Sequence, residues 1–338
     1  EVAWAGGARH TSRLRRGGAA AVTALARTGG TWLVTGGLGG LGLRGASLLA
    51  EGGAARLVLS SRGGRVARDG QGLEARLRGV AAGAAAVWVA ACDGGGGGEA
   101  AAVAAAAGPL AGVLHGAGVL ADRLVQRMAA AQVASVLSPK AAAAAHVHAA
   151  VAQSALAALV LFSSVAAAFG NVGQANYAAA NAWLDSLARW RGAHGAAASS
   201  LQLPAVGGAG MGAAAFDERQ MRYRGMAAIS LEQYAACLST ALSKGVAGTT
   251  QCPLLAQRQS LQDSVADWSQ PLFAELAAAD GSPGSAAGTP SGEAAGATPA
   301  PPPSRLPAGR LWRPSMFLIT SLHAAILSLL ALFLAFLE

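Results

Sequence analysis

The chain has 338 residues, of which 53% are hydrophobic, 12% are charged and 46 are glycine. Its 25 basic residues outnumber the 17 acidic ones but are scattered, and aromatic residues make up only 5%, which argues against a surface for nucleic acid. Three cysteines (Cys92, Cys237 and Cys252) without CxxC spacing argue against a metal site or a disulfide framework and favour a reducing compartment, the cytoplasm.

Short apolar runs alternate with helix-compatible segments along the chain. Such alternation predicts a parallel sheet covered by helices on both faces, and right-handed crossovers leave the doubly wound Rossmann-type arrangement, an α/β fold. The expected strands are Thr31–Thr35, Arg56–Ser60, Ala86–Ala91, Ala111–His115, Ala157–Phe162 and Ser199–Leu203.

Composition divides the chain into four parts. Residues 1–30 predict a linker, or the remnant of a preceding subdomain, and residues 31–260 predict the catalytic domain. Residues 261–310 are rich in Gly, Pro, Ala and Ser and predict a low-complexity linker. Residues 311–338 predict an apolar helix long enough to span a bilayer, with an artefact of the gene model as the alternative. Because the first residue is not methionine, we expect the chain to be part of a longer protein.

A glycine-rich loop, TGGLGGLG, follows the first strand and opens a helix. Glycine permits a tight turn and close approach of the backbone, and a helix N-terminus offers free N–H groups to an anion. Between a strand and a helix, the loop predicts a binding site for the pyrophosphate of a dinucleotide. The expected contacts are Thr35, Gly36, Gly37, Leu38, Gly39, Gly40 and Gly42.

The second strand ends in Ser61 and Arg62, where NAD-binding folds place a carboxylate for the ribose hydroxyls. An arginine in this place can pair with the 2′-phosphate, which favours NADPH over NADH; a solvated loop arginine is the alternative.

The third and fourth strands end in further candidate contacts to the cofactor. Cys92 and Asp93 are expected near the adenine, although Asp93 is equally a turn residue. His115 is followed by three small residues that would let the cofactor pass close to the sheet, and His115 itself is more simply a packed, hydrogen-bonded histidine than a catalyst. The small residues are Gly116, Ala117 and Gly118.

Reduction of a ketone needs a hydride donor, stabilisation of the developing alkoxide and delivery of a proton. A tyrosine delivers the proton well when a nearby cation lowers its pKa. Ser164 is expected near the end of a strand, Tyr177 begins a helix, and Asn181 lies one turn later on the same helical face. The alternative is that Tyr177 and Asn181 are ordinary residues of a helix surface.

Several ordered segments carry a family resemblance: TGGLGGLG, LVLSSRGG, GVLHGAGVL, SPKAAAAAH and FSSVAAAFGNVGQANYAAANAWLDSLA. From about Thr31 to Ala256 the chain resembles the ketoreductase domain of polyketide synthases, within the short-chain dehydrogenase/reductase superfamily. Ordinary members of that superfamily carry Tyr-x-x-x-Lys, whereas this chain has Asn181 at that spacing, and Lys140 matches the displaced lysine of the polyketide enzymes.

The resemblance implies a role for each matched residue. Ser164 binds the substrate carbonyl and Tyr177 donates the proton. Lys140 lowers the pKa of the tyrosine and, with Tyr177, holds the nicotinamide ribose, while Asn181 anchors a water molecule that relays protons. The implied reaction is NADPH-dependent reduction of a carrier-bound β-ketoacyl thioester to a β-hydroxyacyl thioester. The implied partners are the phosphopantetheine arm of an acyl-carrier protein and neighbouring synthase domains.

Two other functions stay open. One is an inactive, reductase-like scaffold that keeps the fold and binds NADPH. The other is a membrane-anchored reductase of lipids or retinoids, against which the missing Tyr-x-x-x-Lys lysine argues. The net charge of +8 fits a nucleotide phosphate or the phosphopantetheine arm, and equally a genome that favours arginine codons.

The family also implies stereocontrol by an LDD-like triplet, of which this chain keeps only the last residue, Asp122. Together with Asn176, and with Phe169 instead of a tryptophan, this favours the B-type outcome, a D-configured hydroxyl; a helix cap is the alternative role for Asp122. Two departures weaken the match: Gln202-Leu203-Pro204 replaces Asn-Trp-Gly, and the glycines of residues 94–98 replace a polar turn.

Overall fold

The computed structural model describes residues 2–5, 8–11, 28–66, 72–84, 86–208, 228–243, 249–251, 262 and 269–274. The chain divides into two compact units, Glu1–Ala279 and Asp280–Glu338, and all described residues belong to the first. The expected apolar helix 311–338 and most of the expected linker 261–310 lie outside the described residues. Among the helices that are described, none is both long and apolar enough to cross a bilayer.

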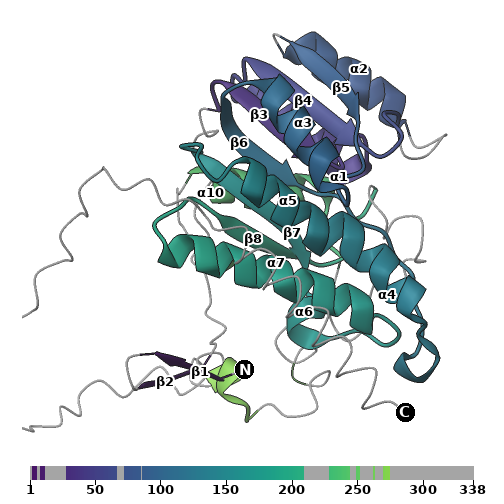
Figure 1. Ribbon diagram of the computed structural model, residues 1–338, viewed down its shortest axis with the longest axis vertical. Coiled ribbons are helices and arrows are strands. Elements are labelled where there is room, and N and C mark those ends of the chain that lie inside the picture. The colour runs from purple at the N-terminus through teal and green to yellow at the C-terminus, as the bar shows by residue number, and fades with distance from the viewer. Residues whose placement is uncertain are drawn as a thin grey trace, which may run out of the picture. The chain divides into compact units, whose positions relative to one another are not determined.

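A seven-stranded parallel sheet forms the centre of the first unit (Figure 1). The chain winds outward from the β3–β6 pair in both directions, which is the doubly wound Rossmann order. The six expected strands are confirmed, and a seventh, β9, was not predicted. In spatial order the strands are β5 (Val87–Ala91), β4 (Arg56–Ser61), β3 (Thr31–Thr35), β6 (Leu110–His115), β7 (Ala158–Ser164), β8 (Ser199–Leu203) and β9 (Thr249–Gln251).

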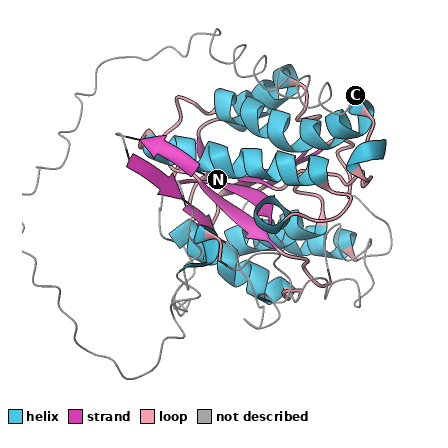
Figure 2. Cartoon of the chain, turned by 90° about the horizontal axis from the view of Figure 1, so that it is seen from below, coloured by secondary structure: helices cyan, strands magenta, loops and turns pink. Residues whose placement is uncertain are grey.

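Helices cover both faces of the sheet (Figure 2). One face carries α1 (Gly40–Glu51), α2 (Leu73–Gly83) and α10 (Leu231–Ser243), and the other carries α3 (Gly97–Ala107), α5 (Ala143–Ala150) and α7 (Ala175–Ala193). Shorter elements complete the unit: η1 (Val125–Arg127), α4 (Ala130–Leu137), η2 (Ser138–Ala142), α6 (Ala166–Phe169) and η4 (Pro271–Phe273).

Alternation along the strands divides the buried side chains between two apolar cores. On β3, Trp32 and Val34 pack into the core beneath α1 and α10, whereas Leu33 packs into the core beneath α5 and α7. Successive side chains of a strand point to opposite faces, so a strand covered on both sides must be apolar throughout. The short continuous apolar runs of the sequence follow from this constraint.

A two-stranded antiparallel sheet lies near the start of the chain, where the sequence predicted a linker or the remnant of a preceding subdomain. Its strands are β1 (Val2–Ala5) and β2 (Ala8–Thr11), paired in a register that sets Val2 opposite Thr11. Part of the segment 1–30 is therefore regular structure.

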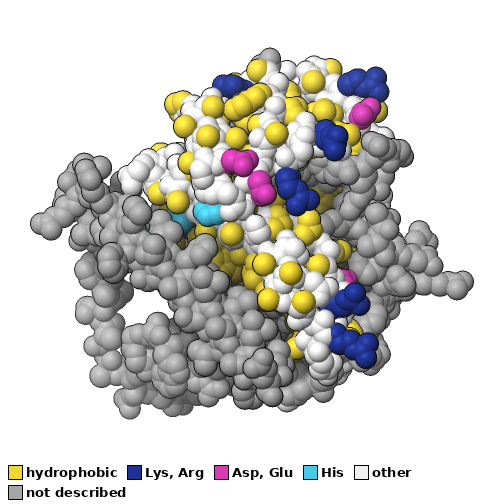
Figure 3. Space-filling model, turned by 45° about the vertical axis from the view of Figure 1, so that its right-hand side comes forward, with side chains coloured by type: hydrophobic (Ala, Val, Ile, Leu, Met, Phe, Trp, Pro, Cys, Tyr) yellow, Lys and Arg dark blue, Asp and Glu magenta, His cyan; other side chains and the backbone are white. Residues whose placement is uncertain are grey.

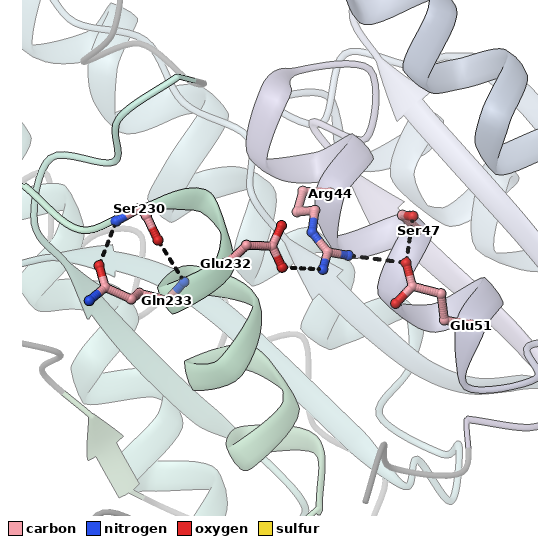
Figure 4. Close-up of polar contacts among 6 residues, drawn as sticks. All are labelled: Arg44, Ser47, Glu51, Ser230, Glu232 and Gln233. Atoms are coloured by element: carbon pink, nitrogen blue, oxygen red, sulfur yellow. Dashed lines mark hydrogen bonds and ion pairs between the residues drawn. The ribbon is translucent and has the colours of Figure 1, made fainter.

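The start of α10 is fixed by a reciprocal cap and by one ion pair to α1 (Figure 4). Ser230 and Gln233 exchange hydrogen bonds of the capping-box type, from the Gln233 N–H to Ser230 Oγ (3.1 Å) and from the Ser230 N–H to Gln233 Oε1 (2.7 Å). Arg44 of α1 pairs with Glu232 at 3.1 Å and with Glu51 at 3.3 Å. Glu232 and Glu51 are solvent-exposed, so these pairs contribute about 0–1 kcal/mol each.

Tyr234 provides the buried anchor between α10 and α1. Its side chain is 0% exposed, its hydroxyl donates to the Leu41 carbonyl (3.0 Å), and its ring meets Phe162 edge-on at 5.7 Å. Gly45 of α1 leaves space for this hydroxyl, since a Cβ there would lie 3.2 Å from it.

Packing continues beyond residue 260, where the sequence predicted the start of a linker. The buried ring of Phe273, in η4, stacks on Phe169 with 6.3 Å between the ring centroids. The first unit therefore includes part of the segment 261–310.

On the described part of the face drawn in Figure 3, hydrophobic side chains are scattered over the surface, and the lysine and arginine side chains stand as separate groups among them.

Truncation of Tyr234 tests whether α10 depends on its buried anchor. We expect Tyr234→Ala to lower the free energy of unfolding by about 3–5 kcal/mol through lost packing, and Tyr234→Phe by about 1 kcal/mol through the lost hydrogen bond. Urea denaturation measures both values. Equal stability of the native protein and Tyr234→Ala would contradict the assigned role.

Candidate active site

The predicted site residues converge at the carboxyl edge of the sheet, which is where doubly wound folds bind ligands. Five neighbouring strands, β5, β4, β3, β6 and β7, end at or just before Cys92, Ser61, Thr35, His115 and Ser164.

The glycine-rich loop turns sharply against the next loop of the sheet. Gly36 has φ +68°, and a Cβ there would lie 2.7 Å from the Ala117 nitrogen; a Cβ on Gly42 would lie 2.8 Å from the Cα of Gly37. Helix α1 begins after Gly39 with no side-chain cap and no acidic residue in its first turn. Its N-terminal N–H groups and positive dipole are thus open to an anion, which fits the pyrophosphate of a dinucleotide.

The small residues after His115 serve contacts within the protein. A Cβ on Gly116 would lie 2.9 Å from the Phe162 ring, and a Cβ on Gly118 would lie 2.9 Å from Lys140 Cε. Gly118 therefore provides the space through which the Lys140 side chain runs.

The ends of β4 and β5 differ in exposure. Arg62 is exposed, and within the described part of the chain no carboxylate pairs with it, while Ser61 Oγ donates to the Arg65 carbonyl (3.2 Å). Cys92 is buried, and burial raises the pKa of its thiol. Asp93 accepts the Gly95 N–H at 3.0 Å, the geometry of a turn residue.

The glycines of residues 94–98 pack against the segment that carries Lys140. A Cβ on Gly95 would collide with Ser138 Oγ, one on Gly94 would lie 2.9 Å from Ala143 Cβ, and one on Gly97 would lie 3.2 Å from the His146 ring. Three of these five glycines thus allow close packing, which explains part of a run that departs from the family pattern.

Lys140 lies in a π-helical turn, Ser138–Ala142, between α4 and α5. π-Helical turns are rare in proteins, and those that occur are often found at functional sites. The side chain of Lys140 is 3% exposed. Its Nζ donates to the Phe162 carbonyl (2.9 Å) and lies 5.2 Å from the centre of the Tyr177 ring. Burial lowers the pKa of Lys140 to about 7, against the opposing attraction of Asp185.

His115 connects the glycine-rich loop to the π-helical turn. Its ring is 0% exposed, with Nδ1 2.7 Å from Thr35 Oγ1 and Nε2 3.0 Å from the Lys140 carbonyl. Because a carbonyl only accepts, Nε2 carries the proton and Nδ1 accepts from the Thr35 hydroxyl. Burial lowers the pKa of His115 to about 4, so the ring is neutral near pH 7. With its whole ring enclosed, His115 acts through Thr35 and Lys140.

Tyr177 lies in the first turn of α7, beside the end of β7. Burial raises the pKa of Tyr177 above its ordinary value, although the nearby side chains of Asn181 and Ser164 counteract part of the effect. Asn181 is fully buried and donates through Nδ2 to the Tyr177 carbonyl (2.8 Å). The structure thus brings Lys140, Ser164, Tyr177 and Asn181 together, but the ammonium of Lys140 lies over the ring and the expected lowering of the tyrosine pKa is not seen.

Asp122 is tied to the start of α7 by a residue that sequence analysis missed. Gln174 Nε2 donates to Asp122 Oδ2 (2.9 Å), and the charge of Asp122 also raises the pKa of Tyr177. Asn176 donates to the Ala121 carbonyl (3.0 Å) and accepts the Tyr177 N–H (2.8 Å). Gln174 lies one turn before Tyr177, and this spacing was the signal in the sequence that could have identified it as a site residue.

A second missed residue is Asp185, which is buried on α7 one turn after Asn181. Its Oδ2 accepts from Gln202 Nε2 (2.7 Å). Sequence analysis noted Gln202 only as a departure from the family. Asp185 follows Asn181 by four residues, and this spacing was the signal that could have identified it as a site residue.

Comparison with known proteins decides the family. Residues 30–208, more than half of the chain, match the family model described as the KR domain. The chain belongs to the KR-domain family. These are the ketoreductase domains of polyketide synthases, oxidoreductases of the short-chain dehydrogenase/reductase superfamily that bind a nicotinamide cofactor.

The relatives of this KR domain are parts of large synthases. Polyketide synthase GfsB of Streptomyces halstedii is 44% identical over 176 residues, 51% of this chain and 3% of that protein. Spectinabilin polyketide synthase system protein NorB of Streptomyces orinoci is 39% identical over 221 residues, 63% of this chain and 10% of that protein. A solved structure of an A1-type ketoreductase has a TM-score of 0.70 and 32% identity, covering 83% of this chain and 60% of that one. This chain spans only a small part of the curated relatives.

The buried His115 makes the stability of the KR domain depend on pH. Its pKa is about 4 when folded and about 6.5 when unfolded, so its contribution is complete above pH 6.5 and is lost as the pH falls towards 4. We expect urea denaturation to show that this group lowers the free energy of unfolding by roughly 3 kcal/mol as the pH falls from 6.5 towards 4.

His115→Asn removes this part of the loss and leaves that of His148, whose pKa burial also lowers to about 4. An unchanged acid-induced loss of stability in His115→Asn contradicts the assignment.

Proposed function

We propose that this KR domain uses NADPH to reduce a carrier-bound β-ketoacyl thioester to the β-hydroxyacyl thioester. The observation that carries the proposal is the convergence of Lys140, Ser164 and Tyr177 at the carboxyl edge of the sheet. A proton donor, a hydroxyl and an ammonium meet there beside a helix N-terminus that is open to a dinucleotide.

When bound, the nicotinamide supplies the hydride to the carbonyl carbon. The Ser164 hydroxyl donates a hydrogen bond to the ketone oxygen, and the Tyr177 hydroxyl delivers a proton to that oxygen as it gains negative charge. Tyr177 carries its proton at neutral pH, as any tyrosine with an unlowered pKa does, and burial raises its pKa further. The ammonium of Lys140 then stabilises the phenolate that remains.

Asn181 supports the return of a proton to Tyr177. Its Oδ1 is buried and has no hydrogen-bond partner among the described residues, so it can accept from a water molecule in the proton relay.

The position of Arg62 supports NADPH as the form of the cofactor. This exposed guanidinium follows β4, which lies beside the strand that leads into the glycine-rich loop. It can form a bidentate pair, with two parallel hydrogen bonds, with the 2′-phosphate.

Arg62→Ala tests this preference. We expect it to raise the KM for NADPH about 10-fold or more, through lost charge-assisted hydrogen bonds, and to change the KM for NADH little. Arg65→Ala, an exposed arginine of the same turn, is the matched control. Equal effects on both cofactors, or equal effects of both variants, oppose the assignment.

The relatives named as polyketide synthases support a carrier-bound substrate and neighbouring synthase domains as partners. The alternative is an inactive scaffold that binds NADPH, which the departures at Gln202-Leu203-Pro204 favour. Turnover of an acetoacetyl N-acetylcysteamine thioester distinguishes the two.

Tyr177→Phe tests the proton donor in that assay. We expect turnover, measured as loss of NADPH absorbance, to fall by about 100-fold or more, while NADPH binding measured by calorimetry stays near the native value. Tyr234→Phe is the matched control, the same change at a buried tyrosine of α10. Residual turnover above a tenth of the native rate refutes the role of Tyr177, and NADPH binding with no turnover by the native protein supports the scaffold.

The B-type configuration implied by Asp122 and Asn176 stays a prediction. Two solved structures similar to this chain are of A-type ketoreductases, at 32% and 34% identity. Chiral chromatography of the hydroxyacyl product distinguishes a D-configured hydroxyl from its mirror image.

A further inference from the structure

A buried carboxylate, that of Asp185, lies on the same helix as Tyr177 and Asn181. Asp185 is 2% exposed and follows Tyr177 and Asn181 at four-residue intervals along α7. Residues at this spacing share one face of a helix. Asp185 is therefore on the face of α7 that carries the proton donor.

The hydrogen bonds of Asp185 do not account for its charge. Oδ2 accepts from the neutral amide of Gln202, while Oδ1 is buried and meets no hydrogen-bond partner in the described part of the chain. Asn181 Oδ1, one turn earlier, is also buried and without a partner. Burying a carboxylate is costly unless an opposite charge or several donors accompany it.

The candidate for the opposite charge is the ammonium of Lys140. The π-helical turn that carries it packs against α7, Lys140 is as deeply buried as Asp185, and the charge of Asp185 acts on it. Among the described groups around Lys140, Tyr177 on α7 and His115 on β6 are both neutral near pH 7. Asp185 is the anion that the described structure sets against this ammonium.

We propose that Asp185 is the counter-charge that keeps Lys140 protonated and in place beneath Tyr177. It is a positioning residue, since it acts through Lys140. Lys140 Nζ has two protons beyond the one donated to Phe162, and the free oxygens of Asp185 and Asn181 are acceptors for a shared water molecule. This inference rests on the proposed role of Lys140 in reduction.

Asp185→Asn removes the charge, keeps the shape and can still accept from Gln202. Without the anion the ammonium loses its proton more readily, so we expect the alkaline limb of the kcat profile to move down by about one pH unit. The chain has only two lysines, Lys140 and Lys244, so ¹³Cε labelling gives two signals. The Lys140 signal of the cofactor-free protein is expected to shift its titration midpoint in the same direction.

Gln202→Met is the control, because it removes the hydrogen bond and leaves the carboxylate. We expect its alkaline limb and lysine signal to match those of the native protein. A native profile in Asp185→Asn, or an equal shift in Gln202→Met, overturns the proposal.

A double-mutant cycle measured by thermal denaturation tests the pairing of Asp185 with Lys140 without any activity assay. Asp185→Asn is expected to lower Tm when Lys140 is present and to raise it in the Lys140→Met background, where the carboxylate has lost its partner. A change in Tm of the same sign in both backgrounds overturns the proposal that Asp185 is the counter-charge of Lys140. Because the cycle needs no turnover, its result is independent of whether the domain reduces a thioester.

Discussion

The structure of the site depends on holding one ammonium group, that of Lys140, out of water. Burial lowers the pKa of Lys140 to about 7 even against the charge of Asp185, which raises it, so the surroundings decide whether the charge persists. The Phe162 carbonyl accepts one of its protons, and His115 holds the backbone carbonyl of the π-helical turn. Gly118 leaves the path open for the side chain.

The doubly wound fold brings together residues that are distant in sequence. Ser164 ends a central strand, and Tyr177 begins the helix that packs on that strand, so their separation is set by regular structure. Lys140 arrives from the turn between two other helices. The hydrogen bonds of His115 then tie that turn to Thr35, at the end of the strand that leads into the glycine-rich loop.

Sequence alone predicted six of the seven strands of the sheet because buried strands leave local marks, whereas the site residues were named largely from a family resemblance and stay predictions. Continuous apolar runs mark strands buried on both faces, and the glycine-rich loop marks a turn that excludes a Cβ. Strand β9 has three residues and depends on pairing with β8, so nothing local announces it. The partners of His115 and the burial of Asp185 are likewise tertiary: Thr35 is 80 residues from His115, and only packing makes Asp185 a buried charge.

Deuterium transfer tests the central claim, reduction of a β-ketoacyl thioester by this domain, most directly. The native protein is incubated with NADPH deuterated at the transferable position of the nicotinamide and with an acetoacetyl N-acetylcysteamine thioester, and the product is analysed by mass spectrometry. The account predicts a hydroxybutyryl thioester with one deuterium on the carbon that bears the hydroxyl. Recovery of unreduced thioester, or of product without deuterium, would contradict it.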